Sequence, residues 1–470
     1  MSDKNYIAAL EISSAKVAVV IGELREGGHL EVVAAEQEKN AESVRYGHIQ
    51  NPEETSLRVA RIIDRLERRH HLQPRKITGV YIGLNGRSLR SLNTSVSLNL
   101  PDDTEITTEI IDRLKEIALN TAIDNSLVTV DAVPRIYTVG KNVTKNPRGV
   151  IGNRISADYD LIVCRPELKR NIQRTVPEKL KLKDHGYIVT ALAAGHLLLS
   201  EEEKRLGCML VDIGAETTSV TIYREGYLRY FATLPLGGRN ITRDLTTLNL
   251  LEERAEDIKI NSGNAMPRTT QTKLNVNGVK LSEVHNLIVA RSEEIVANIV
   301  EQISYAKLKE KDLPAGIICM GGASNLNGLT DLLSRQSSLN VRKAYLPAYI
   351  NFSESASMPD ELLGIVSVLY AAATLGPNAE ACLEMPQQSE LPVTGEPADE
   401  MYDEKGSSQK TAKQRKTKSQ GWFGRIRQQM SNGLGSMFAS PEDQEKDSVS
   451  ASSPSCTKMV RSYSLISSSS

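Results

Sequence analysis

The chain has few aromatic residues and few cysteines for its length. Aromatic residues make up 4% of the 470 positions, and tryptophan occurs once. The five cysteines are scattered, without a CxxC pair or a Cys/His cluster. This usage argues against a cysteine-based metal site and against a disulfide framework, and it fits a reducing cytosol.

The sequence also has no long apolar segment and no strong net charge. No apolar run reaches the ~18 residues that a membrane-spanning helix needs, and the first residues do not have the basic and apolar pattern of a secretory signal. The formal net charge is -1, so no overall field attracts nucleic acid, and we expect no nucleic-acid partner.

Composition changes sharply near residue 385. Residues 1–384 alternate apolar runs with Gly, Asn and Pro turns, which is typical of a globular α/β body. Residues 385–420 are first rich in Pro, Glu and Asp and then basic, which predicts a disordered linker. Residues 421–438 are apolar again, and the Ser-rich residues 439–470 predict a disordered tail.

Two stretches far apart in the body follow one pattern. Residues 6–22 and 208–223 each contain an apolar strand, an acidic residue (Glu11 or Asp212), a turn of small residues and a second strand rich in β-branched residues. Backbone N–H groups of such a turn form a concave site for anions. The repetition predicts two similar domains that face each other, each offering a turn to the phosphates of one nucleotide.

A few side chains near these turns suggest further contacts with a nucleotide. Lys16 is placed to reach a phosphate, and Asp212 is placed to hold a hydrated Mg²⁺, because hard cations prefer carboxylates and water. Gly321 and Gly322 follow a buried strand and let the chain pass against a flat ring such as adenine. Any one such turn is more often an ordinary hairpin, so the order of the segments is the stronger signal.

Between the two hairpins, residues 85–164 are predicted to form a small β-α-β-β insertion, separate from the flanking sheet. Helices are predicted over residues 166–181 and 191–205, and a long amphipathic helix over residues 283–311.

The order of these segments resembles the actin/Hsp70/sugar-kinase ATPase superfamily and, within it, the FtsA family of bacterial cell-division proteins. The residues that carry the resemblance are the first hairpin 10–24, the strand 79–86, the Asn146–Gly149 loop, the helix segment 256–259 and the strand–Gly-Gly segment 315–323. The resemblance covers about residues 5–380 and the tail as well.

The resemblance implies an α/β actin-like ATPase fold, in which two duplicated domains surround a nucleotide cleft and a 1C-type β-α-β-β unit is inserted. It implies the following division: 1–84 as the first part of subdomain 1A, 85–164 as 1C, 165–190 as a return to 1A, 191–265 as 2A, 266–313 as 2B, and 314–384 as the end of 2A and a return to 1A.

The resemblance also implies ATP and Mg²⁺ as cofactors, with weak or absent hydrolysis. The implied nucleotide-binding residues are Ser13, Ser14, Ala15, Lys16, Asp212, Gly214, Ala215, Glu216, Thr217, Gly237, Gly238, Glu256, Lys259, Gly321, Gly322 and Asn325, with Asp212 holding the metal through water. The family usually has Gly where this chain has Ser13. Because Ser tolerates a positive φ less readily than Gly, altered nucleotide binding is expected at this turn.

The apolar segment 421–438 is amphipathic when drawn as a helix. One side carries Trp422, Phe423, Ile426, Met430, Leu434, Met437 and Phe438, and Arg425 and Arg427 add to the basic charge that precedes it. Basic charge beside a bulky apolar face is typical of a helix that lies on an anionic membrane surface. The alternative is docking on the protein's own body or on another protein, as in a calmodulin target.

The resemblance further implies partners: the C-terminal tail of the tubulin-like FtsZ near Arg291, other copies of the chain in a filament, and later divisome proteins. It places the protein on the cytoplasmic side of the inner membrane, at the division septum. The alternatives are a catalytic ATPase of the sugar-kinase or Hsp70 type, a pilus-type or MreB-like assembly protein, and a degenerate fold that keeps the hairpins for packing only.

Overall fold

A computed structural model describes residues 5–40, 42–267, 275–276, 278–353, 362–376 and 379–386. They all belong to one compact unit that ends at Ser389. The predicted helix 421–438, the predicted tail 439–470 and all but the first two residues of the predicted linker lie outside the described residues.

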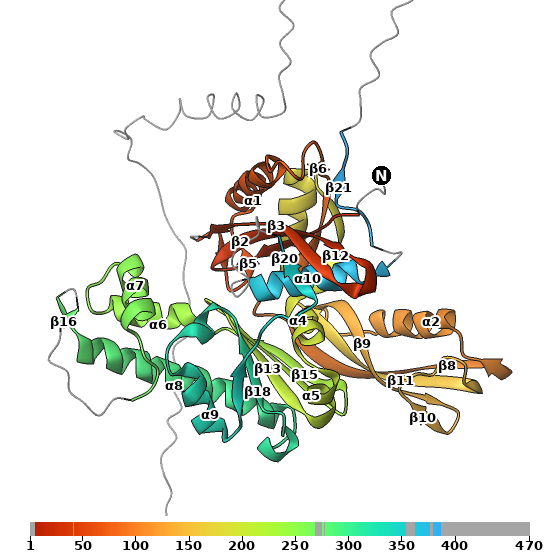
Figure 1. Ribbon diagram of the computed structural model, residues 1–470. Helices are drawn as coiled ribbons and strands as arrows, with labels where there is room; N and C mark the ends of the chain where they lie inside the picture. The colour runs from red at the N-terminus through yellow and green to blue at the C-terminus, as the bar shows by residue number, and fades with distance from the viewer. Residues whose placement is uncertain are drawn as a thin grey trace, which may run out of the picture. The chain divides into compact units, whose positions relative to one another are not determined.

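The first sheet combines an antiparallel meander with parallel strands. Its strands are β1 (Ile7–Ile12), β2 (Lys16–Leu24), β3 (Leu30–Lys39), β7 (Gly79–Leu84), β12 (Lys183–Val189) and β20 (Ile350–Phe352). The order is β12-β7-β1-β2-β3-β20, with β7 parallel to β1. Its helices are α1 (Pro52–Glu67), α4 (Thr190–Leu198) and α10 (Leu363–Ala373). Helix α1 covers one face and α10 the other (Figure 1), so the central strands are apolar on both sides.

The second sheet repeats this arrangement. Its strands are β13 (Cys208–Ile213), β14 (Thr218–Arg224), β15 (Tyr227–Leu234), β18 (Ile317–Met320) and β19 (Val341–Lys343). The order β18-β13-β14-β15 matches β7-β1-β2-β3, with β18 parallel to β13. Its helices are α6 (Gly238–Thr246), α7 (Glu252–Ser262), α8 (Leu281–Tyr305) and α9 (Leu329–Ser337). The predicted duplication of the hairpins is confirmed.

The insertion has the predicted β-α-β-β elements, with one additional short strand (Asn142–Thr144) before the last, and its own apolar core. Its elements are β8 (Arg90–Glu105), α2 (Thr108–Leu119), β9 (Val128–Val139), β10 (Asn142–Thr144) and β11 (Ile151–Cys164). The insertion was predicted to be separate from the flanking sheet. It is separate from the first sheet, but it is joined to the second sheet, so the prediction is wrong there. Strand β8 pairs with β15 at Arg90 and Ala232, which makes one nine-stranded sheet.

The junction between the insertion and the second sheet is also held by a buried ion pair. The Arg135 Nε lies 2.5 Å from an oxygen of the Asp160 carboxylate, whose side chain is completely buried. The same guanidinium donates to the backbone oxygen of Arg229 on β15 at 3.1 Å. A buried ion pair needs such additional hydrogen bonds to offset its loss of water.

Three predicted helices differ from the structure. The predicted helix 283–311 is α8, which ends at Tyr305, followed by the 3₁₀ turn Glu310–Asp312. The other two differ for local reasons. The predicted helix 166–181 is α3 (Pro166–Gln173) followed by a π-helical turn (Arg174–Leu180) that contains Pro177. Proline has no N–H to donate to the preceding turn. The predicted helix 191–205 is two helices, α4 and α5 (Glu201–Leu206), because Ser200 and Glu203 form a capping box that starts a new helix.

The remaining elements are short. They are β4 (Val44–Arg45), β5 (His48–Ile49), β6 (Lys76–Ile77), β16 (Asn275–Val276), β17 (Val279–Lys280), β21 (Leu383–Glu384) and the 3₁₀ turns Glu26–Gly28, Glu310–Asp312 and Gly322–Asn325. The described helices include none that is both long enough and apolar enough to cross a membrane.

Candidate functional site

The first turn, Ser13 to Lys16, is closed by the side chain of its own serine. The Ser13 hydroxyl donates to the Lys16 carbonyl oxygen at 2.9 Å and accepts from the Lys16 N–H at 3.3 Å. The Ser13 N–H donates to the same carbonyl at 2.9 Å. The φ of Ser13 is not positive. The expected conflict between serine and the turn is therefore absent, and serine adds hydrogen bonds that glycine cannot make.

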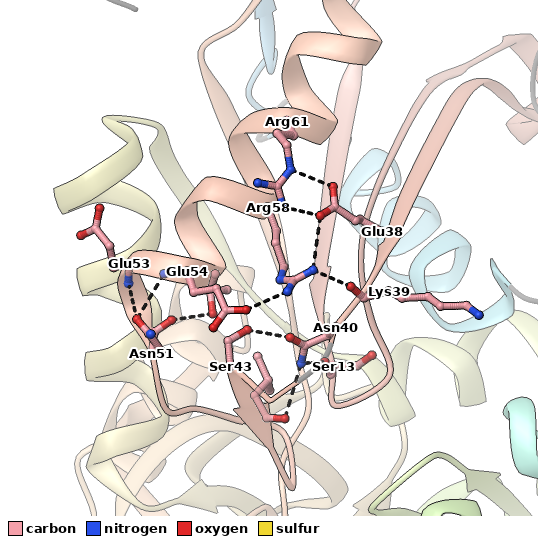
Figure 2. A network of polar contacts seen from close by, with 12 residues as sticks. Ser13, Glu38, Lys39, Asn40, Ser43, Asn51, Glu53, Glu54, Arg58 and Arg61 are labelled. Carbon is pink, nitrogen blue, oxygen red and sulfur yellow. Dashed lines mark hydrogen bonds and ion pairs between the residues drawn. The ribbon is translucent and has the colours of Figure 1, made fainter. Parts of the chain in front are cut away.

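Asn40 supports this turn from behind. Its N–H donates to the Ala15 carbonyl at 2.8 Å, and its Nδ2 donates to the Ser13 carbonyl at 3.2 Å. Its Oδ1 accepts from the Ser43 hydroxyl at 2.6 Å. Figure 2 shows this buried amide between the turn and the segment that leads into α1. Asn40 was not among the predicted site residues, because it follows a run of polar residues at the end of β3 and does not stand out there.

The second turn, Gly214 to Thr217, is held by backbone groups. The Gly214 N–H donates to the Thr217 carbonyl at 2.8 Å, and the Gly238 N–H, at the start of α6, donates to the Gly214 carbonyl at 2.9 Å. A Cβ on Gly237 would lie 2.6 Å from the backbone oxygens of both Gly214 and Ala215. Only glycine permits this approach, so Gly237 fixes the distance between the second turn and α6.

The two acidic residues predicted from the repeat each lie one residue before the end of equivalent strands. Glu11 lies on β1 and Asp212 on β13. Burial raises the pKa of Asp212 to about 7, and the negative charge of Glu11 contributes to the rise, whereas Lys16 opposes it. Burial also raises the pKa of Glu11, again against Lys16. Glu11 and Lys16, from the half of the molecule built on the first sheet, thus act electrostatically on Asp212, from the half built on the second sheet.

Gly321, which follows β18, lies directly against Asp212 near the end of β13. Its φ is +87°, and a Cβ there would lie 2.5 Å from the backbone oxygen of Ile213 and against Oδ1 of Asp212. Gly322 has nothing within 4 Å of its Cβ position. Asn325, at the end of the following 3₁₀ turn, is exposed, and its Oδ1 accepts from Lys343 Nζ at 2.8 Å.

Lys259 and Glu256 of α7 meet α6. The buried Lys259 Nζ donates to the Gly238 carbonyl at 3.2 Å, to the Thr242 hydroxyl at 3.0 Å and to the Glu256 carboxylate at 2.7 Å. Burial lowers the pKa of Lys259, whereas Glu256 opposes this change. The Glu256 side chain is 42% exposed. Of the two, Glu256 therefore has the capacity to bind a ligand.

Glu216 contacts groups from both halves of the molecule: the β4–β5 hairpin on the side of the first sheet and α6 on the side of the second sheet. Its side chain is completely buried, and its carboxylate accepts from the Tyr46 N–H at 2.7 Å. Arg45 and Arg239 pair with it at 3.0 and 3.6 Å, and Arg243 donates to it as well. Glu216 was predicted to be a nucleotide ligand, and its arginine partners were not predicted, because nothing in the spacing of Arg45 relates it to residue 216.

Arg291 of α8 is held by carboxylates. Its Nε and Nη2 donate to Asp244 at 2.6 and 3.0 Å, and its Nη1 donates to Glu294. A small pocket lies along the same helix, lined by Pro267, His285, Asn286, Val289, Ala290 and Glu293. No group of three or more His, Cys, Asp or Glu side chains able to hold a metal occurs within the described ranges. The predicted membrane-binding residues 422–438 lie outside those ranges.

Comparisons with known proteins agree with this arrangement. A family model described as "Cell division protein FtsA" matches residues 209–359, and one described as "SHS2 domain inserted in FTSA" matches residues 86–163. The second match coincides with the β-α-β-β insertion.

Relatives match over most of the chain. "Cell division protein FtsA" of Porphyromonas gingivalis is 32% identical over 339 residues, which cover 70% of each protein. The protein of that name from Escherichia coli K12 is 27% identical over 364 residues, which cover 73% of this chain and 84% of the relative. A solved "PilM-PilN type IV pilus biogenesis complex" has a similar fold, with a TM-score of 0.57, 15% identity and coverage of 78% of this chain and 98% of that one. The duplicated sheets with their inserted unit thus have the actin-like ATPase fold, and the chain belongs to the FtsA family of cell-division proteins.

Proposed function

We propose that the protein binds ATP with Mg²⁺ between its two turns, and that it links FtsZ to the membrane during cell division. The electrostatic action of Glu11 and Lys16 on Asp212 carries the nucleotide part of the proposal. The negative charge of Glu11 helps to raise the pKa of the half-buried Asp212, which favours the protonated acid in the absence of a cation. A hydrated Mg²⁺ beside Asp212 would offset that negative charge, and the turn N–H groups with Lys16 would receive the phosphates.

The rest of the nucleotide has a consistent place. The Glu256 carboxylate suits the ribose hydroxyls, since it is half-exposed and Lys259 holds it in position. Gly322, whose Cβ position is open, leaves room for the base beside β18, and Gly321 packs the preceding backbone against Ile213 and Asp212. Ser14, Ala15, Gly214, Ala215 and Thr217 complete the phosphate side, Gly237 and Gly238 face the α6 start, and Asn325 borders the base.

Calorimetry with the full chain tests the nucleotide part. ATP is expected to bind more tightly with Mg²⁺ than with EDTA, and this gain should disappear in Asp212→Asn. Equal affinity of the wild-type chain with and without Mg²⁺ would remove the metal from the proposal.

The membrane part rests on the amphipathic segment 421–438. Residues Trp422 and Phe423 with the apolar side of that segment would enter the acyl boundary, and Arg425 and Arg427 would meet anionic headgroups. Each attachment is reversible, so several copies in a filament would hold the membrane by avidity. Deletion of residues 421–438 should abolish co-sedimentation with anionic liposomes; equal co-sedimentation of the truncated chain would refute the anchor.

The FtsZ part places the partner's C-terminal tail along α8. The pocket beside His285 and Val289 offers mixed apolar and polar contacts, and Arg291 offers a guanidinium. Because Asp244 already neutralises Arg291, a peptide carboxylate would have to share it. Arg291→Ala should weaken binding of an FtsZ tail peptide. Arg205→Ala, which removes an exposed arginine of α5 away from this pocket, is the control and should bind normally. Later divisome proteins would join this assembly.

A further inference from the structure

The tip of a small hairpin in the first half reaches the second turn. Strands β4 and β5 are joined by Tyr46 and Gly47, whose φ values are +51° and +75°. Tyr46 is a bulky residue in the left-handed region, which costs roughly 1 kcal/mol. A Cβ on Gly47 would lie 2.6 Å from the Cα of Gly86, so the tip is also pressed against the chain that leaves β7.

Both amides of this tip are used to join the two turns. The Gly47 N–H donates to the Ser14 hydroxyl of the first turn at 3.1 Å. The Tyr46 N–H donates to the Glu216 carboxylate of the second turn at 2.7 Å. The Tyr46 hydroxyl accepts from Arg243 of α6 at 3.4 Å, and the Arg87 guanidinium lies 5.2 Å from the centre of its ring. The strained tip is thus held by groups from both halves.

The negative charge of Glu216 stabilises its contact with the β4–β5 tip. Burial acts to raise the pKa of Glu216, but the Tyr46 N–H, Arg45 and Arg239 outweigh burial and hold the pKa below its usual value. The carboxylate therefore stays ionised. If the halves separated, Glu216 would keep Arg239 and Arg243, which lie on its own side, and would lose Arg45 and the Tyr46 N–H. Removing partners from a buried charge is costly.

We propose that Glu216 is a positioning residue that closes the cleft: it captures the β4–β5 tip and thereby fixes the spacing of the two turns. Its role is to hold the halves together, rather than to touch phosphate. A nucleotide between the turns can leave only when this contact opens, so the contact sets the release rate. The nucleotide arm of this inference rests on the proposed ATP binding; the closure itself does not.

Hydrogen exchange of the full, nucleotide-free chain tests the closure. The Tyr46 and Gly47 amides should exchange at least about tenfold faster in Glu216→Ala, because the Tyr46 acceptor is lost. Glu216→Gln should be intermediate, since an amide oxygen still accepts from Tyr46 but no longer attracts arginine. Unchanged protection of both amides in Glu216→Ala, with the β13 amides still protected, would overturn the proposal.

The matched control removes a carboxylate that joins elements of one half only. Glu203 binds Arg342 through two nitrogens, at 3.1 and 2.6 Å, within the second sheet's domain. Glu203→Gln should leave the Tyr46 and Gly47 amides protected. If Glu216→Ala does not fold, Arg45→Gln serves instead, because it removes a partner from the opposite half; its effect should exceed that of Arg239→Gln, and the reverse order would contradict the closure.

Release of a fluorescent ATP analogue with Mg²⁺ tests the consequence. It should be about tenfold faster in Glu216→Ala and unchanged in Glu203→Gln. Faster amide exchange with unchanged release would overturn the link to nucleotide. If the wild-type chain binds no nucleotide, the proposed function fails, and amide exchange still decides the closure.

Discussion

The turn after β1 and the turn after β13 occupy equivalent places in the two sheets, yet different groups hold them. The second turn is fixed by backbone hydrogen bonds and by Gly237, which fits where a side chain would not. The first turn has an equivalent backbone closure, from the Ser13 N–H to the Lys16 carbonyl, but it is additionally fixed by side chains, namely the Ser13 hydroxyl and the Asn40 amide. The comparison indicates that a duplicated anion site can be kept by two different means, one intolerant of any added atom and the other dependent on particular polar groups.

The largest effect is expected at Gly321, on the second side. Gly321→Ala forces a Cβ against the Ile213 carbonyl and Asp212 at a positive φ, and should destabilise the protein by about 3 kcal/mol. Gly322→Ala is the neighbouring control, because its Cβ would meet nothing within 4 Å; it should unfold at the wild-type urea concentration. Similar losses in both variants would show that steric fit is not what holds the second side.

Asp212→Asn should weaken Mg²⁺-dependent ATP binding by about 10–100-fold, the range found when a group that orients a metal's ligands is lost. The measurement is calorimetric titration with and without Mg²⁺. Binding without Mg²⁺ serves as the control and should change little. A variant that keeps its Mg²⁺ dependence would assign the metal to the first side, at Glu11.

The same substitution should change how stability depends on pH. The folded pKa of Asp212 is about 7, above its unfolded value. Its contribution to stability is therefore complete below about pH 4 and is lost as pH rises through 7. In metal-free buffer, the free energy of unfolding of Asp212→Asn minus that of wild type should be about 2 kcal/mol larger at pH 8 than at pH 5. Urea unfolding at both pH values checks this; parallel curves would refute the raised pKa.

Asn40→Ala sharpens the comparison on the first side. It removes the donor to the Ser13 carbonyl and the acceptor of the Ser43 hydroxyl, and should cost about 1–3 kcal/mol because buried polar groups lose their partners. Asn325→Ala is an exposed asparagine control with little expected loss. If Asn40→Ala unfolds like wild type, the first turn does not depend on this amide.

The smallest effect is expected at Ser13. Ser13→Ala loses hydroxyl bonds worth about 1 kcal/mol and should weaken ATP binding by about fivefold. Ser13→Gly, which restores the usual family residue, loses the same bonds and should show no gain in affinity. A gain in Ser13→Gly would mean that serine obstructs the nucleotide.

The sequence alone predicted the repeated hairpins, the inserted unit and the glycines, because each depends on local pattern. Strand β1 pairs with β2, which follows it directly in the chain. Gly321 directly follows β18. The pairing of β8 with β15, the hydrogen bond from Asn40 to the Ser13 carbonyl and the contact of Arg45 with Glu216 join residues far apart in the chain. No spacing rule relates Arg45 to Glu216, so these contacts required the structure.

The central claim, that the second turn is rigid and metal-directed whereas the first depends on replaceable side chains, is tested most directly by one titration series. ATP affinity is measured with and without Mg²⁺ for wild type, Asp212→Asn and Ser13→Ala. The account predicts that Asp212→Asn loses the Mg²⁺ gain, whereas Ser13→Ala keeps it with a uniform, smaller loss. Loss of the Mg²⁺ gain in Ser13→Ala, with Asp212→Asn unaffected, would contradict it.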